Sequence, residues 1–442
     1  MKRVRSQGAE EVYVLSAMLS LAGTLGWASF DGRFWSSHFY RTDLFGLVHV
    51  FTLGWLSLII QGVLLRLAPM VLGTRTRSLR WLLVLAGLWI IGASGLASHM
   101  FRGEWFGVWT AGLCLWIAAL FIPLSHPGLI KLAIKGDAVA TYAVLGIGHL
   151  ILAASLGIFI GLNKHLGLIA VKPYALLGAH FHLAEVGWVT FMMLGFGRKL
   201  LPITAPSAET EPRSSRLRLI GLELGLVLTA GSLLLGSRLL PVGASLLAWM
   251  LILHVAPLVR DLLRGRIKDR STFWAAVAAL FLVLDSLLGV TMACSLDRWL
   301  PWTRDRLLFA YGAIAFLGWN TLTIVSLALK LFPLWVWQER FGADWGVRPV
   351  PRVTDLYRPW LREATGIGLT LGTLLTAAGL LQGSGALAQW GVRVVFAGVV
   401  CFLVNFVLMA RWEMFDITFT PGPSDWERFH ALRREKDVSS SS

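Results

Sequence analysis

Charged side chains are scarce in this sequence. They make up 15% of its 442 residues, against about 25% in an ordinary soluble domain, whereas hydrophobic residues make up 56%. No hydrophilic stretch is long enough to form a soluble domain of its own. This shortage of charge excludes a soluble enzyme and a disordered protein, and it predicts a polytopic membrane protein.

Cysteine is also nearly missing. The chain has three, Cys114, Cys294 and Cys401, and each stands alone inside an apolar run. No CxxC pair and no CxxCH motif occurs, which excludes a disulfide framework, a dithiol redox site and covalent haem attachment through such a motif. Basic residues outnumber acidic ones by 40 to 25, and in a membrane protein the net charge of +15 indicates topology rather than nucleic-acid binding.

Twelve apolar runs are long enough to cross a bilayer, which takes about 20 residues. The runs are continuously apolar and lack the alternation of a β-barrel, so the predicted fold class is an all-α integral membrane protein. The predicted spans are, in order, 11–29, 44–73, 79–99, 105–123, 138–162, 176–203, 217–236, 241–259, 272–294, 305–337, 364–383 and 389–410.

Basic residues gather at one end of this predicted bundle. They precede the first span and follow spans two, four, six and eight. The positive-inside rule then places both termini in the cytoplasm of a multi-pass protein of the cell inner membrane, and the same clusters would bind anionic lipid. Residues 1–410 would form the membrane domain, and 411–442 a polar cytoplasmic tail that we expect to be mostly disordered.

Three of the spans share one pattern. Span two reads GLVHVFTLGWLSLIIQGVLLRLAPM, span six GAHFHLAEVGWVTFMMLGFGRKLLPI and span ten YGAIAFLGWNTLTIVSLALKLFPLW. Each contains Gly-Trp, at Gly54, Gly187 and Gly318, followed at fixed intervals by a small residue, a base and a proline. The small residues would let neighbouring helices approach closely.

The spacing of the pattern predicts an internal repeat. The three glycines lie 133 and 131 residues apart, so each repeat contains four helices. We therefore expect three four-helix repeats around a pseudo-threefold axis, at about 11–123, 138–259 and 272–410. The alternative is chance convergence among helices that are rich in glycine and tryptophan.

Histidines occupy matching places on two of these spans. His49 and His182 each lie five residues before the glycine, where the third span has Ala313. An intramembrane histidine is costly without a partner, so it is a functional candidate. Two imidazoles on symmetry-related helices can hold a planar macrocycle from both sides, as in a six-coordinate electron-transfer haem. The alternative is that both are polar contacts between helices or donors to a backbone carbonyl.

A third histidine, His180, stands two residues before His182. Residues i and i+2 of a helix point about 200° apart, so these two side chains cannot chelate one metal ion. They can instead serve two cofactors on opposite sides of the helix. His180 would then bind a second haem iron that keeps an open position for a small gas.

The spans, the repeat and the HxH of GAHFHLAEVGW (178–188) resemble subunit I of the haem-copper oxidase superfamily. That superfamily includes the C-type oxidases and nitric oxide reductases, and the NnrS family of membrane haem proteins is a distant relative. The resemblance implies one or two haems, expected to be b-type. It makes His49 and His182 the axial ligands of a low-spin haem iron, and His180 the ligand of a high-spin haem iron.

The copper ligands of that superfamily are missing here. In the superfamily the copper ligands are a histidine on helix six and a histidine pair on helix seven. In this sequence span seven, LRLIGLELGLVLTAGSLLL, contains no histidine, and span ten contains none either. We therefore do not expect a copper centre. The sequence names no catalytic residue.

The functional hypothesis is a membrane haem protein that transfers electrons, or that binds or reduces nitric oxide or dioxygen as an oxidoreductase. A separate cytochrome or a quinol would donate electrons, and small accessory subunits and membrane lipid are the other expected partners, with no nucleic acid. The alternatives are a transporter or haem- or metal-trafficking protein without redox activity, and a structural subunit without cofactor.

Other polar residues in the spans have two interpretations each. Glu185 would orient a ligand or take up a proton, or would bond to a neighbouring helix. Glu223 and Asp285 would belong to a proton route, or would pair with bases such as Lys330. His149 and His254 have no counterpart in the other repeats and are expected to be core residues. Outside the spans, His38, His99 and His165 are expected at the outer surface, and Arg33, Arg41 and Arg102 are candidates to neutralise haem propionates.

Overall fold

The computed structural model describes residues 8–36, 38–170, 172–200, 212–415 and 417–440. All regular structure in these ranges is helical. Eleven helices there are long and apolar enough to cross a membrane. They are α1 (Ala9–Phe30), α3 to α4 (Thr42–Leu72), α5 (Leu79–Arg102), α6 (Trp105–Ser125), α8 (Ala138–Leu166), α11 (Pro212–Leu235), α12 (Leu240–Leu263), α13 (Arg270–Ala293), α14 to α15 (Arg304–Phe341), α16 (Pro359–Gln382) and α17 (Gly385–Met414).

The predicted sixth span, 176–203, forms a further long helix. It runs without a break through α9 (Pro173–His182), η2 (Leu183–Thr190) and α10 (Phe191–Leu200), and positions 201–203 lie outside the described residues. Two histidines and Glu185 lower its mean hydropathy, which explains why it is not among the eleven.

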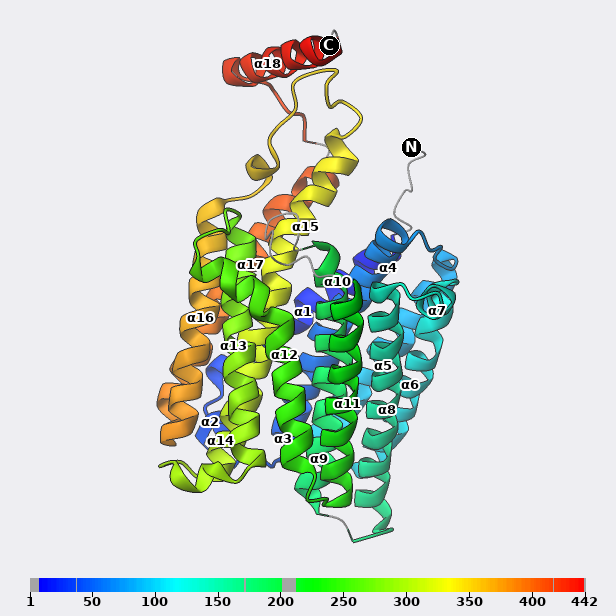
Figure 1. Cartoon of the computed structure of the whole chain (residues 1–442), viewed down its shortest axis with the longest axis vertical. Coiled ribbons are helices and arrows are strands. Elements are labelled where there is room, and N and C mark those ends of the chain that lie inside the picture. Colours follow the sequence, from blue (N-terminus) through cyan, green and yellow to red (C-terminus); the bar gives the residue numbers. More distant parts are fainter. Residues whose placement is uncertain (1–7, 37, 171, 201–211, 416, 441–442) are drawn as a thin grey trace.

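The helices stand side by side as an antiparallel bundle (Figure 1). Neighbours in sequence pack as hairpins, most extensively α5 with α6, α11 with α12 and α16 with α17. The short helices α2 (Arg33–Ser36) and α14 lie at one end of the bundle, and α7 (Leu129–Ile134) lies at the other. We call these the α14 end and the α7 end.

Three of the long helices widen in the middle. Each contains an eight-residue π-helical segment: η1 (Val50–Ser57), η2 (Leu183–Thr190) and η5 (Ile314–Thr321). The segments begin directly after His49, His182 and Ala313, the three positions that the sequence pattern aligns. π-Helical turns are rare in proteins and frequently mark functional sites.

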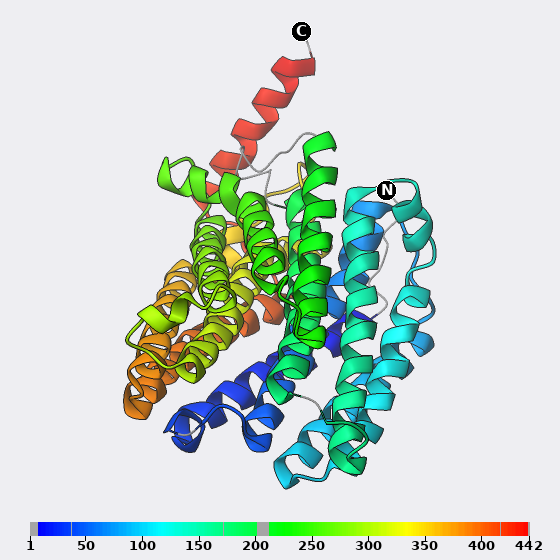
Figure 2. The same cartoon turned by 60° about the horizontal axis from the view of Figure 1, so that its bottom comes forward.

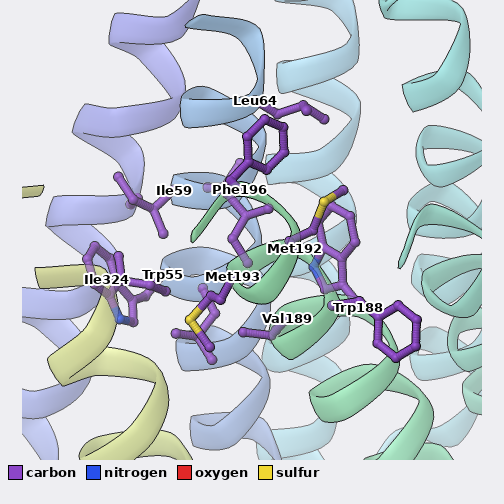
Figure 3. Close-up of a cluster of buried hydrophobic side chains, with 14 of the residues drawn as sticks. Trp55, Ile59, Leu64, Trp188, Val189, Met192, Met193, Phe196 and Ile324 are labelled. Atoms are coloured by element: carbon purple, nitrogen blue, oxygen red, sulfur yellow. The ribbon is translucent and has the colours of Figure 1, made fainter. Parts of the chain in front are cut away.

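The tryptophans of the Gly-Trp pairs lie in these segments and connect them. Trp55 donates from Nε1 to Thr321 Oγ1 at 3.3 Å, Trp188 to Ser57 Oγ at 3.1 Å, and Trp319 to Thr190 Oγ1 at 2.8 Å. Each acceptor hydroxyl lies two residues after one of the other tryptophans in the sequence. The three hydrogen bonds therefore connect the three helices in a closed cycle, which we call the tryptophan ring. Figure 3 shows the buried core around two of its members, Trp55 and Trp188.

The glycines of the same pairs sit where two helices touch. A Cβ on Gly54 would lie 2.6 Å from Ser20 Oγ on α1, one on Gly187 2.6 Å from His149 Cβ on α8, and one on Gly318 2.6 Å from Phe281 Cγ on α13. No room exists for a methyl group at any of these contacts. The expectation that small residues permit close helix packing is therefore confirmed.

The tail contains one helix. Helix α18 (Pro423–Ser440) follows α17 and lies beyond the bundle at the α7 end (Figures 1 and 2). Phe429 is buried, and Arg428 donates to the backbone oxygen of Val350, in the segment before α16, at 3.1 Å.

One buried histidine near the α7 end gives a prediction about pH. His126 directly follows α6, is 2% exposed, and burial lowers its pKa to about 4. Between about pH 6.5 and 4 the unfolded chain therefore binds one more proton than the folded chain, and stability falls as the pH is lowered. We expect a loss of about 2 kcal/mol between pH 7 and pH 5 that His126→Gln removes.

Chemical unfolding in detergent at both pH values would measure this loss. Other groups titrate in the same range, so the relevant quantity is the difference between wild type and His126→Gln. Equal losses of unfolding free energy in the two proteins would contradict the assignment to His126.

Candidate functional site

The three candidate histidines lie on two neighbouring helices, each at the point where an α-helix becomes π-helical. His49 ends α3, and His180 and His182 are in the last turn of α9. The local sequence favours this arrangement because the apolar runs continue the helix on both sides, so each histidine is held in the middle of a rigid span rather than in a loop.

All three histidines use the same ring nitrogen to contact the backbone. Nδ1 lies 2.7 Å from Phe45 O in His49, 2.9 Å from Ala153 O in His180 and 2.7 Å from Gly178 O in His182. A carbonyl oxygen only accepts, so Nδ1 donates and Nε2 carries the lone pair. This is the orientation that metal-ligating histidines adopt.

His49 and His180 lie next to each other. Their ring centroids are 6.1 Å apart and the ring planes differ by 28°. Neither Nε2 has a hydrogen-bond partner within the part of the chain that the structure describes. The sequence pattern pairs His49 with His182 instead, and among the described residues the ring that lies next to His49 is that of His180.

His182 faces another neighbour. Its Nε2 lies 3.4 Å from the hydroxyl of Tyr311 on α14, and the two ring centroids are 6.3 Å apart. His180 meanwhile reaches Ala153 on α8. The two histidines of the HxH therefore contact different helices, as the 200° separation predicted.

One cavity connects these side chains. It has a volume of about 1040 Å³ and is lined by all three histidines together with Tyr311. This volume is at the upper end of ligand pockets. Around the His49–His180 pair its walls are apolar and come from α3, α5, α6 and α8, with Val48, Trp89, Leu96, Leu115, Leu150 and Ile158 among them.

The cavity extends toward the α14 end. It starts at Trp188 and Ser57 of the tryptophan ring and reaches Lys172, Ser237 and Arg304, where α9, α12 and α14 begin. Lys172 has no carboxylate partner among the described residues. Arg304 donates to Met292 O at 2.6 Å and pairs with Asp297 at 3.6 Å, so Lys172 is the cation of the mouth that no described carboxylate compensates.

Two carboxyl groups line the same cavity on the Tyr311 side. Glu185 is 4% exposed and accepts from Thr190 Oγ1 at 3.2 Å, and Thr190 in turn accepts from Trp319. Asp285 is 5% exposed, and its Oδ1 has no hydrogen-bond partner among the described residues. Both acids thus belong to the site that the histidines form.

The third acid, Glu223, has a different role. It lies 3.1 Å from Nε2 of His149, which packs against Gly187. His254 similarly contacts the hydroxyl of Tyr142 at 2.5 Å. None of these four ionisable side chains lines the cavity. His149 is buried, as expected of a core residue, whereas His254 is half-buried.

The outer arginines have local partners rather than a place at the cavity. Arg33 pairs with Asp31, Arg41 with Asp43 and Arg102 with Glu104. The hydrogen bond from Arg33 lowers the pKa of Asp31 to about 2, and those from His99 and Arg102 lower the pKa of Glu104. His38 pairs with Asp305 in the same way, at 3.0 Å.

Sequence reasoning missed Tyr311 and Lys172. Tyr311 stands two residues before Ala313, as His180 stands two before His182, so the repeat alignment contained the signal. Lys172 lies in the loop before α9 and carries no motif. Lys172 becomes a candidate site residue only because the folded chain places it at the mouth of the cavity.

Comparison with known proteins assigns no family. No family model matches the chain, and no curated protein matches it. Among the described residues, no three side chains of His, Cys, Asp or Glu gather as ligands for a single metal ion. The site must therefore be interpreted from its own geometry.

Proposed function

We propose that this chain is a membrane haem protein built from three four-helix units around a pseudo-threefold axis, with twelve spans. The tryptophan ring supports the symmetry because each unit gives one indole and one hydroxyl to the cycle. The glycine contacts support it too, since each glycine packs against the first helix of its own unit. The basic α7 end would face the cytoplasm, with both termini in an inner membrane.

We infer that His49 and His180 hold the haem iron. The single observation that carries this inference is a pair of imidazoles, 6.1 Å between centroids, with both Nε2 atoms free of hydrogen bonds to the described residues in one apolar cavity. Two protein ligands suffice for a metal that brings a porphyrin as its equatorial ligand.

The distance between the rings fits this assignment. The two rings would hold the iron through their Nε2 atoms, and a metal–imidazole bond of about 2 Å is short enough for one metal ion to fit between rings 6.1 Å apart. The carbonyl oxygens of Phe45 and Ala153 fix both tautomers, which leaves each Nε2 available as a ligand. Lys172 would bind the haem propionates at the mouth of the cavity.

Electron transfer is the function that this arrangement supports best, and a bound haem would supply its one-electron chemistry. Binding or reduction of a small gas such as nitric oxide or dioxygen would require one of the two imidazoles to leave the iron. The chain itself holds the imidazoles, excludes water with apolar walls, and keeps Tyr311, Glu185 and Asp285 on the other side of α9. The donor would be a separate cytochrome or a quinol.

The size of the cavity also supports a second candidate. About 1040 Å³ with Lys172 at the mouth would suit transport of an amphiphilic ligand, or trafficking of haem itself. A trafficking protein releases haem to an acceptor, whereas a redox protein retains it through cycles of oxidation and reduction. Whether the purified protein retains haem in the presence of an acceptor therefore distinguishes the two candidate functions.

The deciding experiment is the haem content of the purified protein. A pyridine haemochrome assay and a reduced-minus-oxidised spectrum in detergent should show b-type haem that stays bound during incubation with excess apomyoglobin. Transfer to apomyoglobin would favour trafficking. Absence of haem from a well-folded preparation, expressed with haem in excess, would contradict the proposal.

A pair of glycines on α8 gives a sharper steric test. A Cβ on Gly157 would lie 3.1 Å from Cε1 of His180, whereas Gly148, on the same helix, has open space. We expect Gly157→Leu to displace the His180 ring and lower haem content at least about tenfold, and Gly148→Leu to leave it unchanged. Haem per protein in the two variants measures this. Equal retention would indicate that His180 is not a ligand.

A further inference from the structure

A second, smaller hollow lies on the outside of the bundle at the α7 end. It has a volume of about 370 Å³ and is bounded by one face of α12 and by α13. Ile252, Ala256, Val259 and Leu263 come from α12, and Val283 comes from α13. These side chains recur every three or four residues, so they form one apolar strip along the helix. We call this hollow the α12–α13 groove.

Two arginines complete the groove where α12 ends. Arg260 and Arg264 are exposed, line the groove, and stand four residues apart, so they are on the same face. Within the described part of the chain neither guanidinium has an ion pair or a side-chain hydrogen bond. The adjacent Asp261 is fully buried and lies 3.9 Å from Arg266 instead.

This arrangement is unfavourable without an anion. Like charges at i and i+4 of a helix repel each other, and no carboxylate of the described chain compensates Arg260 and Arg264. Other arginines nearby are neutralised, such as Arg270 by Glu363 at 2.6 Å. Paired guanidinium groups are well suited to a phosphate group, which they bind through several charge-assisted hydrogen bonds.

We propose that the α12–α13 groove is a binding site for one anionic phospholipid. The phosphate would bind Arg260 and Arg264, and an acyl chain would lie along Ile252, Ala256, Val259 and Val283. The apolar strip matches the acyl chain of such a lipid, and the two arginines match its phosphate. The strip begins at Ile252 and the arginines follow toward the end of α12, so the tail and the headgroup would lie in this order along the helix. Basic pockets between membrane helices bind anionic lipid for the same reason.

The test compares phosphatidylglycerol with phosphatidylcholine. Delipidated full-length protein is titrated with each lipid, and binding is counted by native mass spectrometry. We expect one tight phosphatidylglycerol molecule per chain, and Arg260→Ala/Arg264→Ala should weaken its binding about 30-fold, since each basic residue near the surface contributes about a factor of five. Ala256→Trp keeps both charges but fills the groove, so it should weaken binding as well.

A matched control removes the same charge elsewhere. Arg75 and Arg80 are exposed at the same end of the bundle, but neither lines the groove, so Arg75→Ala/Arg80→Ala should bind phosphatidylglycerol like wild type. Equal affinity for the two lipids would overturn the proposal. So would unchanged binding in Arg260→Ala/Arg264→Ala, or equal losses in both double variants, which would indicate attraction to the net charge only. Thermal unfolding of each variant in detergent checks that it is folded.

Discussion

Alanine at position 49 or 180 should abolish low-spin haem binding. Each substitution removes one of the two imidazoles whose centroids lie 6.1 Å apart, and the remaining ligand cannot hold a six-coordinate iron alone. We expect haem per protein to fall at least about tenfold in His49→Ala and in His180→Ala. The low-spin ferric signal in electron paramagnetic resonance should disappear in both.

His182→Ala separates the two ways of pairing the histidines. The sequence pattern pairs His49 with His182, which would make His182→Ala as damaging as His49→Ala. The geometry pairs His49 with His180, so His182→Ala should keep the low-spin signal. Loss of that signal in His182→Ala, with retention in His180→Ala, would restore the sequence-based pairing.

A histidine outside the cavity serves as the control. His254 lies near the other end of its helix, bonded to Tyr142, and does not line the cavity. His254→Ala should therefore bind haem like wild type. Haem loss in this variant as well would mean that the substitutions act through general destabilisation rather than through ligation.

Truncation of Trp188 should give the largest loss of stability. The side chain is 1% exposed, packs in the main core and donates to Ser57. Trp188→Ala removes a large buried side chain and is expected to cost about 3–5 kcal/mol of unfolding free energy. Trp249, which is 56% exposed on α12, is the matched control, and Trp249→Ala should change stability by about 0.5 kcal/mol or less.

A double-mutant cycle isolates the hydrogen bond from the packing. Trp188→Phe keeps most of the ring but leaves the Ser57 hydroxyl without its donor, and Ser57→Ala removes the acceptor. We expect the two substitutions together to cost about 1 kcal/mol less than the sum of the single ones. Additive costs, measured by unfolding in mixed detergent, would show that the bond contributes nothing.

Long apolar runs made most of the bundle predictable. Eleven of the predicted spans correspond to helices that are long and apolar enough to cross a membrane, because about 20 consecutive apolar residues have few alternatives to such a helix. The register of the Gly-Trp pairs also anticipated where Gly54, Gly187 and Gly318 meet their neighbours. These features depend on local sequence and on a fixed spacing.

The π-helical segments and the histidine partner could not be predicted in this way. A run such as VFTLGWLS is apolar on all sides, so its periodicity does not distinguish a π-helix from an α-helix. Likewise, the pairing of His49 with His180 depends on how α3, α8 and α9 pack, which the spacing of His49 and His182 does not contain. The contact between His149 and Glu223 likewise depends on how their helices pack, so the sequence did not predict it.

The tryptophan ring joins residues that are synthesised at very different times. The indole of Trp55 is made early in synthesis, but its acceptor, Thr321, emerges 266 residues later. Until then the N–H of Trp55 lacks this acceptor, and a nascent chain that ends before residue 321 cannot close the tryptophan ring. The ring is therefore completed only when translation delivers the last third of the protein.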